Sequence, residues 1–469
     1  MFINEGTNSL RNTIIRWVGI PERIYLLVAL IGTVGFAVIT PPFHGPDEEA
    51  HYVRVQYIAH GHILPIDPDT TNASLPESIQ ITAQKTFYDV DLPGRTSEKY
   101  DVNLIEREIK VPLNEKEVYK PPMISYTALA YLPAVPGVII ANAFDASPVL
   151  SMYVARISLA LASVLIIYFA IKILPAKKYL FTTIALVPML LFQQAMVSID
   201  GISYALLLLF ICIVLYFYKR GNLTKGNWIS IGGLSLFIVL AKPLVFLFLP
   251  VILLLSKEKN ALRWITGIAI CCVIVLSSIS FYNAHNADKV ITPETPAGAN
   301  SSVQMANLVE NPKRFFRVMW NTYMTEYGDE KLRGVIGIFG SADTKYVLWA
   351  MVLYIMLFTL VAFVQFSKTD NIHISKYVKI AILILCALYF ALVNLAIYLS
   401  FSPVNFDIIY GVQGRYFIPI ILVVPLLITP FLRVRNDQRR VELKVAVALL
   451  FLTLVALFIT FQRYYLFTP

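Results

Sequence analysis

The chain has 469 residues, of which 57% are hydrophobic and only 15% are charged, and its mean hydropathy is +0.66. These values exclude a soluble globular protein of this size, whose charged residues would make up about a quarter of the chain. The net charge of +9 does not indicate nucleic-acid binding, because the basic residues lie at the ends of apolar segments and not in one patch.

Apolar segments long enough to form transmembrane helices recur along the chain. They predict an all-α polytopic membrane protein with eleven spans. The spans are expected at about 24–40, 150–173, 179–196, 201–218, 228–241, 244–256, 262–282, 346–366, 379–400, 416–432 and 445–466. The fifth and sixth are short, each covering about 20 Å of a hydrocarbon core of about 30 Å. We therefore predict a turn below the membrane surface at "AKP", residues 241–243.

One further apolar segment, at 123–142, contains Pro133 and Pro136, which disfavour a continuous helix. If this segment does not span, every loop on one side of the membrane carries basic residues, as the positive-inside rule requires of cytoplasmic loops. We therefore expect a re-entrant or interfacial helix at 123–142, a cytoplasmic N-terminus and an extracytoplasmic C-terminus. The chain is then one membrane domain, 1–469, with large extracytoplasmic loops at 41–122 and 283–345.

The motif "PDEEAHYVRV" directly follows the first predicted span. It predicts a short helix on which Asp47, His51 and Arg54 share a face, at spacings of four and three residues. One interpretation is that Asp47 is a general base presented to a cavity, and another is that it caps the helix. The histidines nearby lack the spacing of a zinc site, whereas Mg²⁺ or Mn²⁺ bound to carboxylates stays open.

Further polar residues fall at or near the extracytoplasmic ends of the predicted spans. Asp200, Lys242 and Arg415 are the most unusual, because ionisable groups within a membrane are costly and tend to line a cavity. Lys242 and Arg415 can clamp a phosphate. The alternatives are that Lys242 extends to the interface, Arg415 anchors the topology and Asp200 caps a helix. Lys120, in "VYKPPM", is either part of the same cavity or a surface charge.

A second pattern is the alternation of basic and aromatic residues in "NPKRFFRVMWNTY", residues 311–323. It favours an amphipathic helix on a membrane surface over a nucleic-acid groove.

Six segments of the chain form a recognisable series. They are, in order, "PPFHGPDEEAHYVRVQYIAHGHILP", "VYKPPMISYTALAYLPA", "ARISLALASV", "SIDGISYALLL", "AKPLVFLFLPVILL" and "GVQGRYFIPI". Through them the chain resembles the domain-of-unknown-function 2142 family of bacterial multi-pass membrane proteins, which is similar in layout to the GT-C glycosyltransferases. The resemblance covers nearly the whole chain, and its specific parts are the acidic motif after the first span and "QGRYF" followed by proline near the end.

The resemblance implies an enzyme of the bacterial cytoplasmic membrane that transfers a sugar from a polyprenyl-phosphate carrier to an acceptor on the extracytoplasmic face. The acceptor would be an envelope glycan, a lipid or a protein. Asp47 is the candidate base, with Glu48 as its neighbour, and a single base with in-line attack predicts inversion. The residues expected to bind substrates are His51, Arg54, Lys120, Asp200, Lys242, Gln413, Arg415 and Tyr416.

Two other classes of membrane protein are the alternatives. A polysaccharide polymerase or ligase would need room for two lipid-linked glycans, about which the sequence says nothing. A transporter of lipid-linked glycans would place its ionisable residues near the midplane of the membrane, whereas here they fall at one face.

Overall fold

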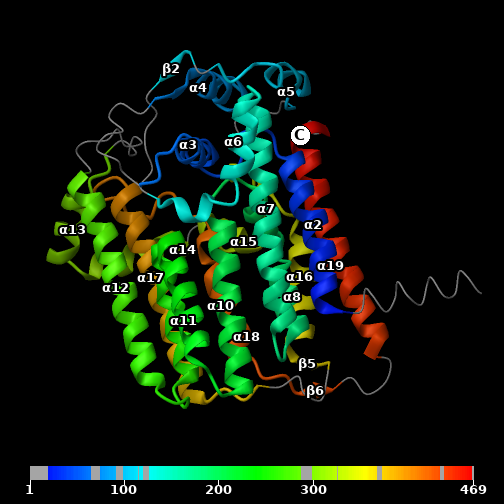
Figure 1. Ribbon diagram of the computed structural model, residues 1–469, viewed down its shortest axis with the longest axis vertical. Coiled ribbons are helices and arrows are strands. Elements are labelled where there is room, and N and C mark those ends of the chain that lie inside the picture. The colour runs from blue at the N-terminus through cyan, green and yellow to red at the C-terminus, as the bar shows by residue number, and fades with distance from the viewer. Residues whose placement is uncertain are drawn as a thin grey trace, which may run out of the picture.

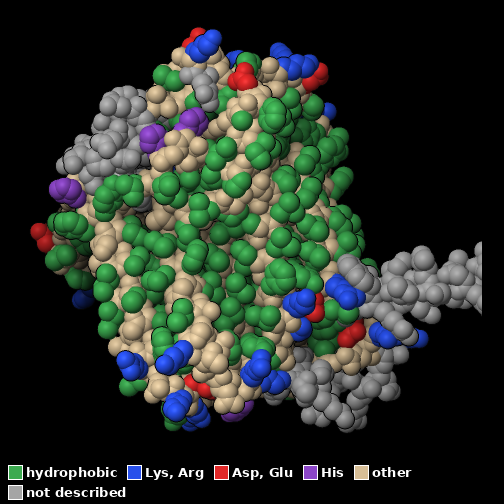
Figure 2. Space-filling view, viewed as in Figure 1, with side chains coloured by type: hydrophobic (Ala, Val, Ile, Leu, Met, Phe, Trp, Pro, Cys, Tyr) green, Lys and Arg blue, Asp and Glu red, His purple; other side chains and the backbone are tan. Residues whose placement is uncertain are grey.

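The computed structural model describes residues 20–64, 74–90, 99–114, 116–119, 126–286, 298–324, 326–366, 372–433 and 438–466. Its helices stand side by side in one bundle (Figure 1). Side chains on the face seen in Figure 2 are almost all hydrophobic between two ends that carry charges, as expected of a surface in contact with lipid chains. The prediction of an all-α polytopic membrane protein is confirmed.

Six described helices are long and apolar enough to cross a membrane. They are α2 (Pro21–Ile39), α7 (Pro148–Ile173), α10 (Asp200–Arg220), α12 (Ala261–Asn286), α17 (Lys376–Phe401) and α19 (Gln438–Phe461). Shorter apolar helices are α11 (Lys225–Ala241), η4 (Pro243–Leu255), α16 (Leu348–Phe363), and η6 (Gly414–Phe417) continuing into α18 (Ile418–Leu427). The count of eleven spans stays a prediction, because these shorter helices do not cross a bilayer by length alone.

The segment predicted as one span at 179–196 is divided into α8 (Lys178–Ala185) and α9 (Pro188–Ala195). Pro188 occupies the first turn of α9, where its missing N–H costs nothing, but it cannot continue a preceding helix. The turn predicted at residues 241–243 is confirmed. Lys242 has an extended backbone between α11 and η4, with φ −151° and ψ 97°.

One end of the bundle, at the top in Figure 1, carries a group of short elements. We call it the α3 end. Its elements are α3 (Glu48–Ala59), α4 (Glu77–Ala83), η2 (Gln84–Tyr88), α5 (Val102–Glu108), η3 (Ala128–Tyr131), α6 (Val135–Ala143), and an antiparallel pair of β1 (Leu75–Pro76) with β2 (Val118–Tyr119). The described part of segment 123–142 thus forms η3, a turn and all of α6 except its last residue.

The segment before α16 contains three further helices and a short hairpin. They are α13 (Ser301–Glu310), α14 (Lys313–Met324), α15 (Glu326–Gly337), β3 (Ile338–Phe339) and β4 (Thr344–Lys345). The C-terminal turn η7 (Gln462–Leu466) extends α19 at the α3 end, near the C label in Figure 1.

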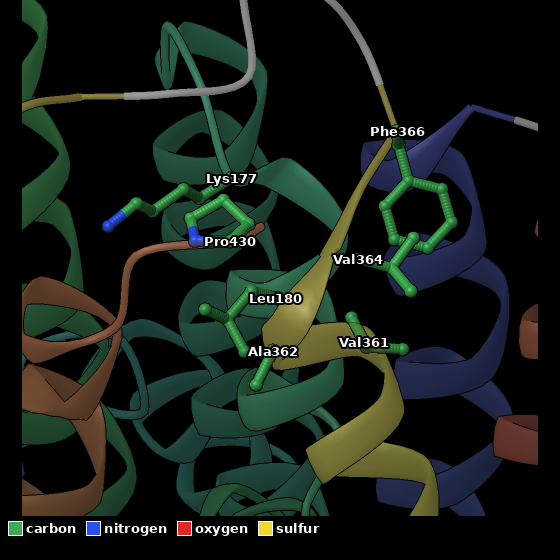
Figure 3. Close-up of a pocket in the computed structure, with 7 residues that line it drawn as sticks. All are labelled: Lys177, Leu180, Val361, Ala362, Val364, Phe366 and Pro430. Atoms are coloured by element: carbon green, nitrogen blue, oxygen red, sulfur yellow. The ribbon is translucent and has the colours of Figure 1, made fainter. Parts of the chain in front are cut away.

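At the opposite end of the bundle, β5 (Val364–Gln365) and β6 (Leu432–Arg433) form a parallel pair of short strands. Nearby, Nζ of Lys177 donates to the carbonyl oxygens of Pro425 and Ile428, at 2.9 and 2.6 Å, and thereby satisfies the C-terminus of α18. The hollow beside Lys177 and Pro430 (Figure 3) has a volume of about 10 Å³, the space of at most one water molecule. It is therefore no substrate site.

Candidate functional site

Asp47 stands directly before α3, with its backbone in the left-handed region at φ 55°. Its side chain makes no capping hydrogen bond, so the capping interpretation does not describe it. Instead, Oδ2 of Asp47 accepts a hydrogen bond from Nη2 of Arg415 at 2.7 Å. The Asp47 side chain is 63% exposed, whereas that of Arg415 is only 3% exposed. The carboxylate is thus open to solvent while its cationic partner belongs to the interior.

Arg415 makes contacts with three other side chains around it. Its Nε donates to Oε1 of Gln413 at 2.8 Å, and Nη2 also donates to the hydroxyl of Tyr416 at 3.3 Å. On its other side, Nη1 lies 3.7 Å from Oδ2 of Asp200. Arg415 therefore lies between two carboxylates, those of Asp47 and Asp200, which come from distant parts of the chain.

Lys242, which lies in the break between α11 and η4, is the fourth charged residue of this group. Its Nζ lies 2.5 Å from Oδ1 of Asp200 and donates to the hydroxyl of Tyr204 at 3.1 Å. It also lies 4.9 Å from the centre of the Tyr204 ring. Asp47, Arg415, Asp200 and Lys242 thus form a chain of alternating charge, which we call the ion cluster.

The ion cluster has no net charge, but one of its oxygen atoms makes no hydrogen bond within the described part of the chain. Two carboxylates face two cations, which offsets much of the cost of placing ions at the edge of a membrane. Oδ2 of Asp200 is buried and makes no hydrogen bond to any described group. A buried acceptor without a donor costs free energy, and here the nearby charge of Arg415, with Nη1 at 3.7 Å, partly offsets that cost.

The side chain of His51 lies next to the ion cluster, one turn of α3 after Asp47. Its Nδ1 lies 2.6 Å from the hydroxyl of Tyr131, and its ring stacks on that of Tyr126 with 5.7 Å between the centres. Burial lowers the pKa of His51 to about 4, and the nearby carboxylates of Asp47 and Asp200 only partly oppose this effect. The imidazole is therefore neutral at pH 7.

Arg54 does not join the ion cluster, although the sequence predicted that it shares a face with Asp47 and His51. Its guanidinium donates to the backbone carbonyls of Tyr126, His62 and Ile63, at distances between 2.7 and 3.0 Å. All of these acceptors belong to loops at the α3 end. Arg54 therefore holds loops together through three of its five N–H groups, and its part in substrate binding stays a prediction.

Glu48, adjacent to Asp47, points away from the ion cluster into the bundle. Its Oε1 and Oε2 accept from Nε and Nη2 of Arg156 at 2.7 and 2.5 Å, and further from the backbone N–H groups of Val197 and Gly45 at 3.0 and 2.9 Å. Burial raises the pKa of Glu48, but Arg156 and the amide donors outweigh burial, so the pKa lies below its ordinary value. With four donors, this carboxylate is occupied, and its role is to position the chain.

Arg156 is the residue that the sequence analysis missed. It lies in the apolar helix α7 and is fully buried. Besides Glu48, it donates to the carbonyl oxygens of Ala37, Thr40 and Pro41 at 2.7 to 2.9 Å. It thus fixes the turn between α2 and α3, from which Asp47 projects. An arginine inside an apolar span was the signal that could have revealed it.

Lys120, the remaining predicted substrate-binding residue, lies outside the described residues. The described part of the chain contains no group of three His, Cys, Asp or Glu side chains that could hold a metal ion. The carboxylates of Asp47 and Asp200 are paired with Arg415 and Lys242, respectively.

Comparison with known proteins gives one result. Residues 30–424 match the family described as "predicted membrane protein (DUF2142)", and this region contains all four residues of the ion cluster. Searches of curated proteins and of solved structures gave no match. The match covers most of the chain, so the protein belongs to the DUF2142 family of membrane proteins.

Proposed function

We propose that the protein is an integral membrane glycosyltransferase of the GT-C type, which moves a sugar from a polyprenyl-phosphate carrier to an acceptor of the cell envelope. The observation that carries the proposal is the ion cluster, in which an exposed carboxylate, Asp47, lies against buried cations. Transfer from a phosphate carrier needs these two functions side by side: a base for the acceptor and positive charge for the leaving phosphate.

Arg415 and Lys242 are the groups that would bind the carrier phosphate. An arginine can offer two parallel donors to phosphate oxygens, and a lysine adds a point charge. In the structure both cations are held by carboxylates, at 2.7 Å for Asp47 with Arg415 and 2.5 Å for Asp200 with Lys242. The phosphate would therefore take over part of the role of these carboxylates and draw Arg415 away from Asp47.

Asp47 would then accept the proton of the acceptor hydroxyl. The acceptor oxygen forms its bond to the anomeric carbon while the bond from that carbon to the phosphate oxygen breaks. The polyprenyl phosphate leaves with the electron pair, and the paired cations stabilise its charge. Attack opposite to the leaving phosphate inverts the anomeric centre.

The aromatic and neutral side chains around the ion cluster suit a sugar. Tyr416 lies beside Arg415, with 4.9 Å between the guanidinium and the ring centre, and Tyr126 stacks on His51. A neutral histidine can exchange hydrogen bonds with sugar hydroxyls without adding charge. We therefore expect the transferred sugar between Tyr416, Tyr126 and His51.

The distribution of basic residues supports an extracytoplasmic position of the site. Helices α7, α10 and α17 have lysine or arginine at the ends away from the α3 end, and Figure 2 shows basic side chains gathered at that lower end. By the positive-inside rule this end faces the cytoplasm of a bacterial cell. The ion cluster would then open to the side on which envelope polymers are built.

Genetic complementation tests the proposal and identifies the sugar at the same time. The gene is deleted, and the sugar composition of the cell envelope is compared after complementation with the parent, Asp47→Asn or Glu49→Gln. Glu49 is the matched control, because it is an acid on the same turn that bonds to Tyr88 and not to the ion cluster. We expect the parent and E49Q to restore the missing sugar and D47N to fail, at equal protein levels in the membrane.

Restoration by D47N at the parent level would show that Asp47 is not the base. Envelope glycans that do not change on deletion would argue against a glycosyltransferase. Accumulation of lipid-linked glycan on the cytoplasmic side would favour the transporter instead.

A further inference from the structure

The first turn of helix α14 lies beside the C-terminal end of α17, which is the end of α17 nearer to the α3 end of the bundle. In its first turn, Nη2 of Arg314 donates to the carbonyl oxygen of Asn405 at 2.5 Å and lies 3.5 Å from Oδ1 of Asp407. Asn405 and Asp407 belong to the segment just beyond the last residue of α17, Phe401. The start of α14 is therefore located beside the end of a membrane-spanning helix.

From there α14 runs along α17 in the opposite direction. The ring of Phe315 lies 6.4 Å from that of Tyr398, and the ring of Tyr323 lies 5.1 Å from that of Phe390. Both contacts are eight residues apart along each helix, a rise of about 12 Å. Because the order of the partners is reversed, the two helices are antiparallel over two turns.

The lower contact includes a hydrogen bond at depth in the membrane. The hydroxyl of Tyr323 donates to Oδ1 of Asn394 at 2.8 Å. Asn394 precedes the end of α17 at Phe401 by seven residues, about 10 Å along the helix. An asparagine at this depth needs a partner, and α14 supplies it. The C-terminal half of α14 therefore lies below the end of the membrane-spanning helix.

The exposure of α17 changes where α14 begins to cover it. In the half away from the α3 end, Leu383, Ile384 and Leu388 are exposed, as expected of side chains that face lipid. Nearer to the α3 end, Asn394 and Tyr398 are buried, and both lie at the contacts with α14. Thus α14 takes the place of lipid against this half of α17, and its own outward side is presented where lipid would otherwise be.

The outward side of α14 has the side chains that such a position requires. Lys313 and Arg317 are exposed in its first half. Phe316, Trp320 and Met324 are 74%, 66% and 64% exposed along the same stripe. Basic side chains suit the phosphates of lipid headgroups, tryptophan suits the interface, and methionine suits the acyl chains. Along α14 the basic, tryptophan and methionine side chains follow one another in the same order as the headgroups, the interface and the acyl chains of a membrane.

We propose that α14 is inserted into the membrane leaflet at the α3 end and that the stripe Lys313, Phe316, Arg317, Trp320 and Met324 binds bilayer lipid. The segment expected to be an extracytoplasmic loop, 283–345, thus contains a helix that re-enters the bilayer. The occupant of the stripe is lipid, because its charges complement lipid phosphates and because α14 lies beside α17, whose other half carries exposed apolar side chains. This inference does not depend on the reaction that the protein catalyses.

Site-directed spin labelling in lipid nanodiscs tests the proposal. The four native cysteines are replaced by serine or alanine, and single labels are placed by Glu310→Cys, Phe316→Cys, Trp320→Cys, Met324→Cys or Leu388→Cys. Collisions with molecular oxygen, which concentrates in the bilayer, are compared with collisions with a water-soluble nickel chelate. Leu388 is the control for a lipid-facing side chain and Glu310 for a water-facing one.

We expect the ratio of oxygen to nickel collisions to rise from E310C through F316C to W320C and M324C, with the last two close to L388C. Ratios at W320C and M324C equal to that at E310C would overturn the proposal. Exclusion of both reagents, together with coupling between labels on two chains, would identify the stripe as a dimer contact and also overturn it.

A measurement without labels provides an independent check. The chain has five tryptophans, and Trp320→Phe removes the one on the stripe while keeping an aromatic side chain. Lipids brominated on their acyl chains quench tryptophans that contact them. We expect the parent to lose a larger fraction of its emission than W320F, and equal quenching of the two would contradict lipid contact.

Discussion

Nη2 of Arg415 lies 2.7 Å from Oδ2 of Asp47, although 368 residues separate them in the sequence. One residue stands at the end of the turn after α2, and the other lies in η6 before α18. The packing of the whole bundle is needed to bring them together. This contact places an exposed carboxylate directly beside a buried guanidinium.

Replacing Arg415 by lysine keeps the charge but removes the planar group that reaches Asp47, Gln413 and Tyr416 at once. A hydrogen bond to a charged group contributes about 1.5–3 kcal/mol, so we expect R415K to transfer sugar about 10- to 100-fold more slowly. The rate is measured in proteoliposomes with a polyprenyl-phosphate donor that carries the sugar identified by the deletion experiment. Arg333→Lys, at an exposed arginine paired with Asp329, is the control and should keep the parent rate. A parent rate in R415K would exclude bidentate binding.

The buried pair of Glu48 and Arg156 should be the most sensitive point for stability. Arg156→Met leaves a buried carboxylate without its cation, and loss of one partner of such a pair costs about 3–5 kcal/mol. We expect a large fall in the thermal unfolding midpoint in detergent. Arg107→Met, at a pair in which both partners are at least half exposed, should change stability by no more than about 1 kcal/mol.

The double variant Glu48→Gln with Arg156→Met separates the ion pair from other effects of Arg156. If the unpaired charge causes the loss, the double variant should be more stable than R156M alone. A double variant that is less stable by the sum of both single losses would show that the backbone contacts of Arg156 dominate.

Much of this architecture follows from local features of the sequence. Runs of apolar residues predict the membrane class, and a lysine before a proline in such a run predicts the break at Lys242, which the structure contains. Asp200, Lys242 and Arg415 could be selected because each is an ion at a place where an ion is costly. These signals depend only on the composition of a short segment.

The roles of neighbouring residues could not be derived in this way. Asp47 and Glu48 are adjacent acids, and only the position of Arg156, 108 residues away, decides which one is buried. Arg54 has the expected spacing from His51, but three of its donors bond to loop carbonyls and none to the ion cluster. In α14 the pattern predicts an amphipathic helix, whereas the side that is covered depends on α17. Such assignments need the tertiary contacts.

Two buried histidines predict that the protein loses stability in acid. Burial lowers the pKa of both His44 and His51 to about 4, from 6.5. Between these values the unfolded chain binds more protons than the folded one, so stability is complete above pH 6.5 and falls as the pH drops toward 4. The loss at pH 5 is about 2 kcal/mol per histidine.

Unfolding midpoints in detergent at pH 7.5 and pH 5.0 measure this effect. We expect His51→Gln to show a smaller drop between the two pH values than the parent, because glutamine does not titrate. His285→Gln, at an exposed position, should show the full drop. An equal drop in H51Q and the parent would mean that His51 does not contribute to acid sensitivity.

The close approach of η6 to α15 predicts that Gly414 tolerates no side chain. A Cβ at this position would lie 2.2 Å from the carbonyl carbon of Gly334 and 2.3 Å from the backbone nitrogen of Val335. Backbone atoms cannot rotate away, so Gly414→Ala must move η6, and with it Arg415. We expect a loss of about 1–3 kcal/mol in stability from overpacking together with a loss of transfer.

Gly233→Ala is the matched control for this substitution. A Cβ at Gly233, inside α11, would meet nothing within 4 Å, and alanine is favoured over glycine in a helix by up to about 1 kcal/mol. G233A should therefore keep its activity and its unfolding midpoint, or gain slightly. Transfer at the parent rate by G414A would show that the site does not depend on the contact between η6 and α15, because Arg415 could then keep its bond to Asp47 with η6 displaced.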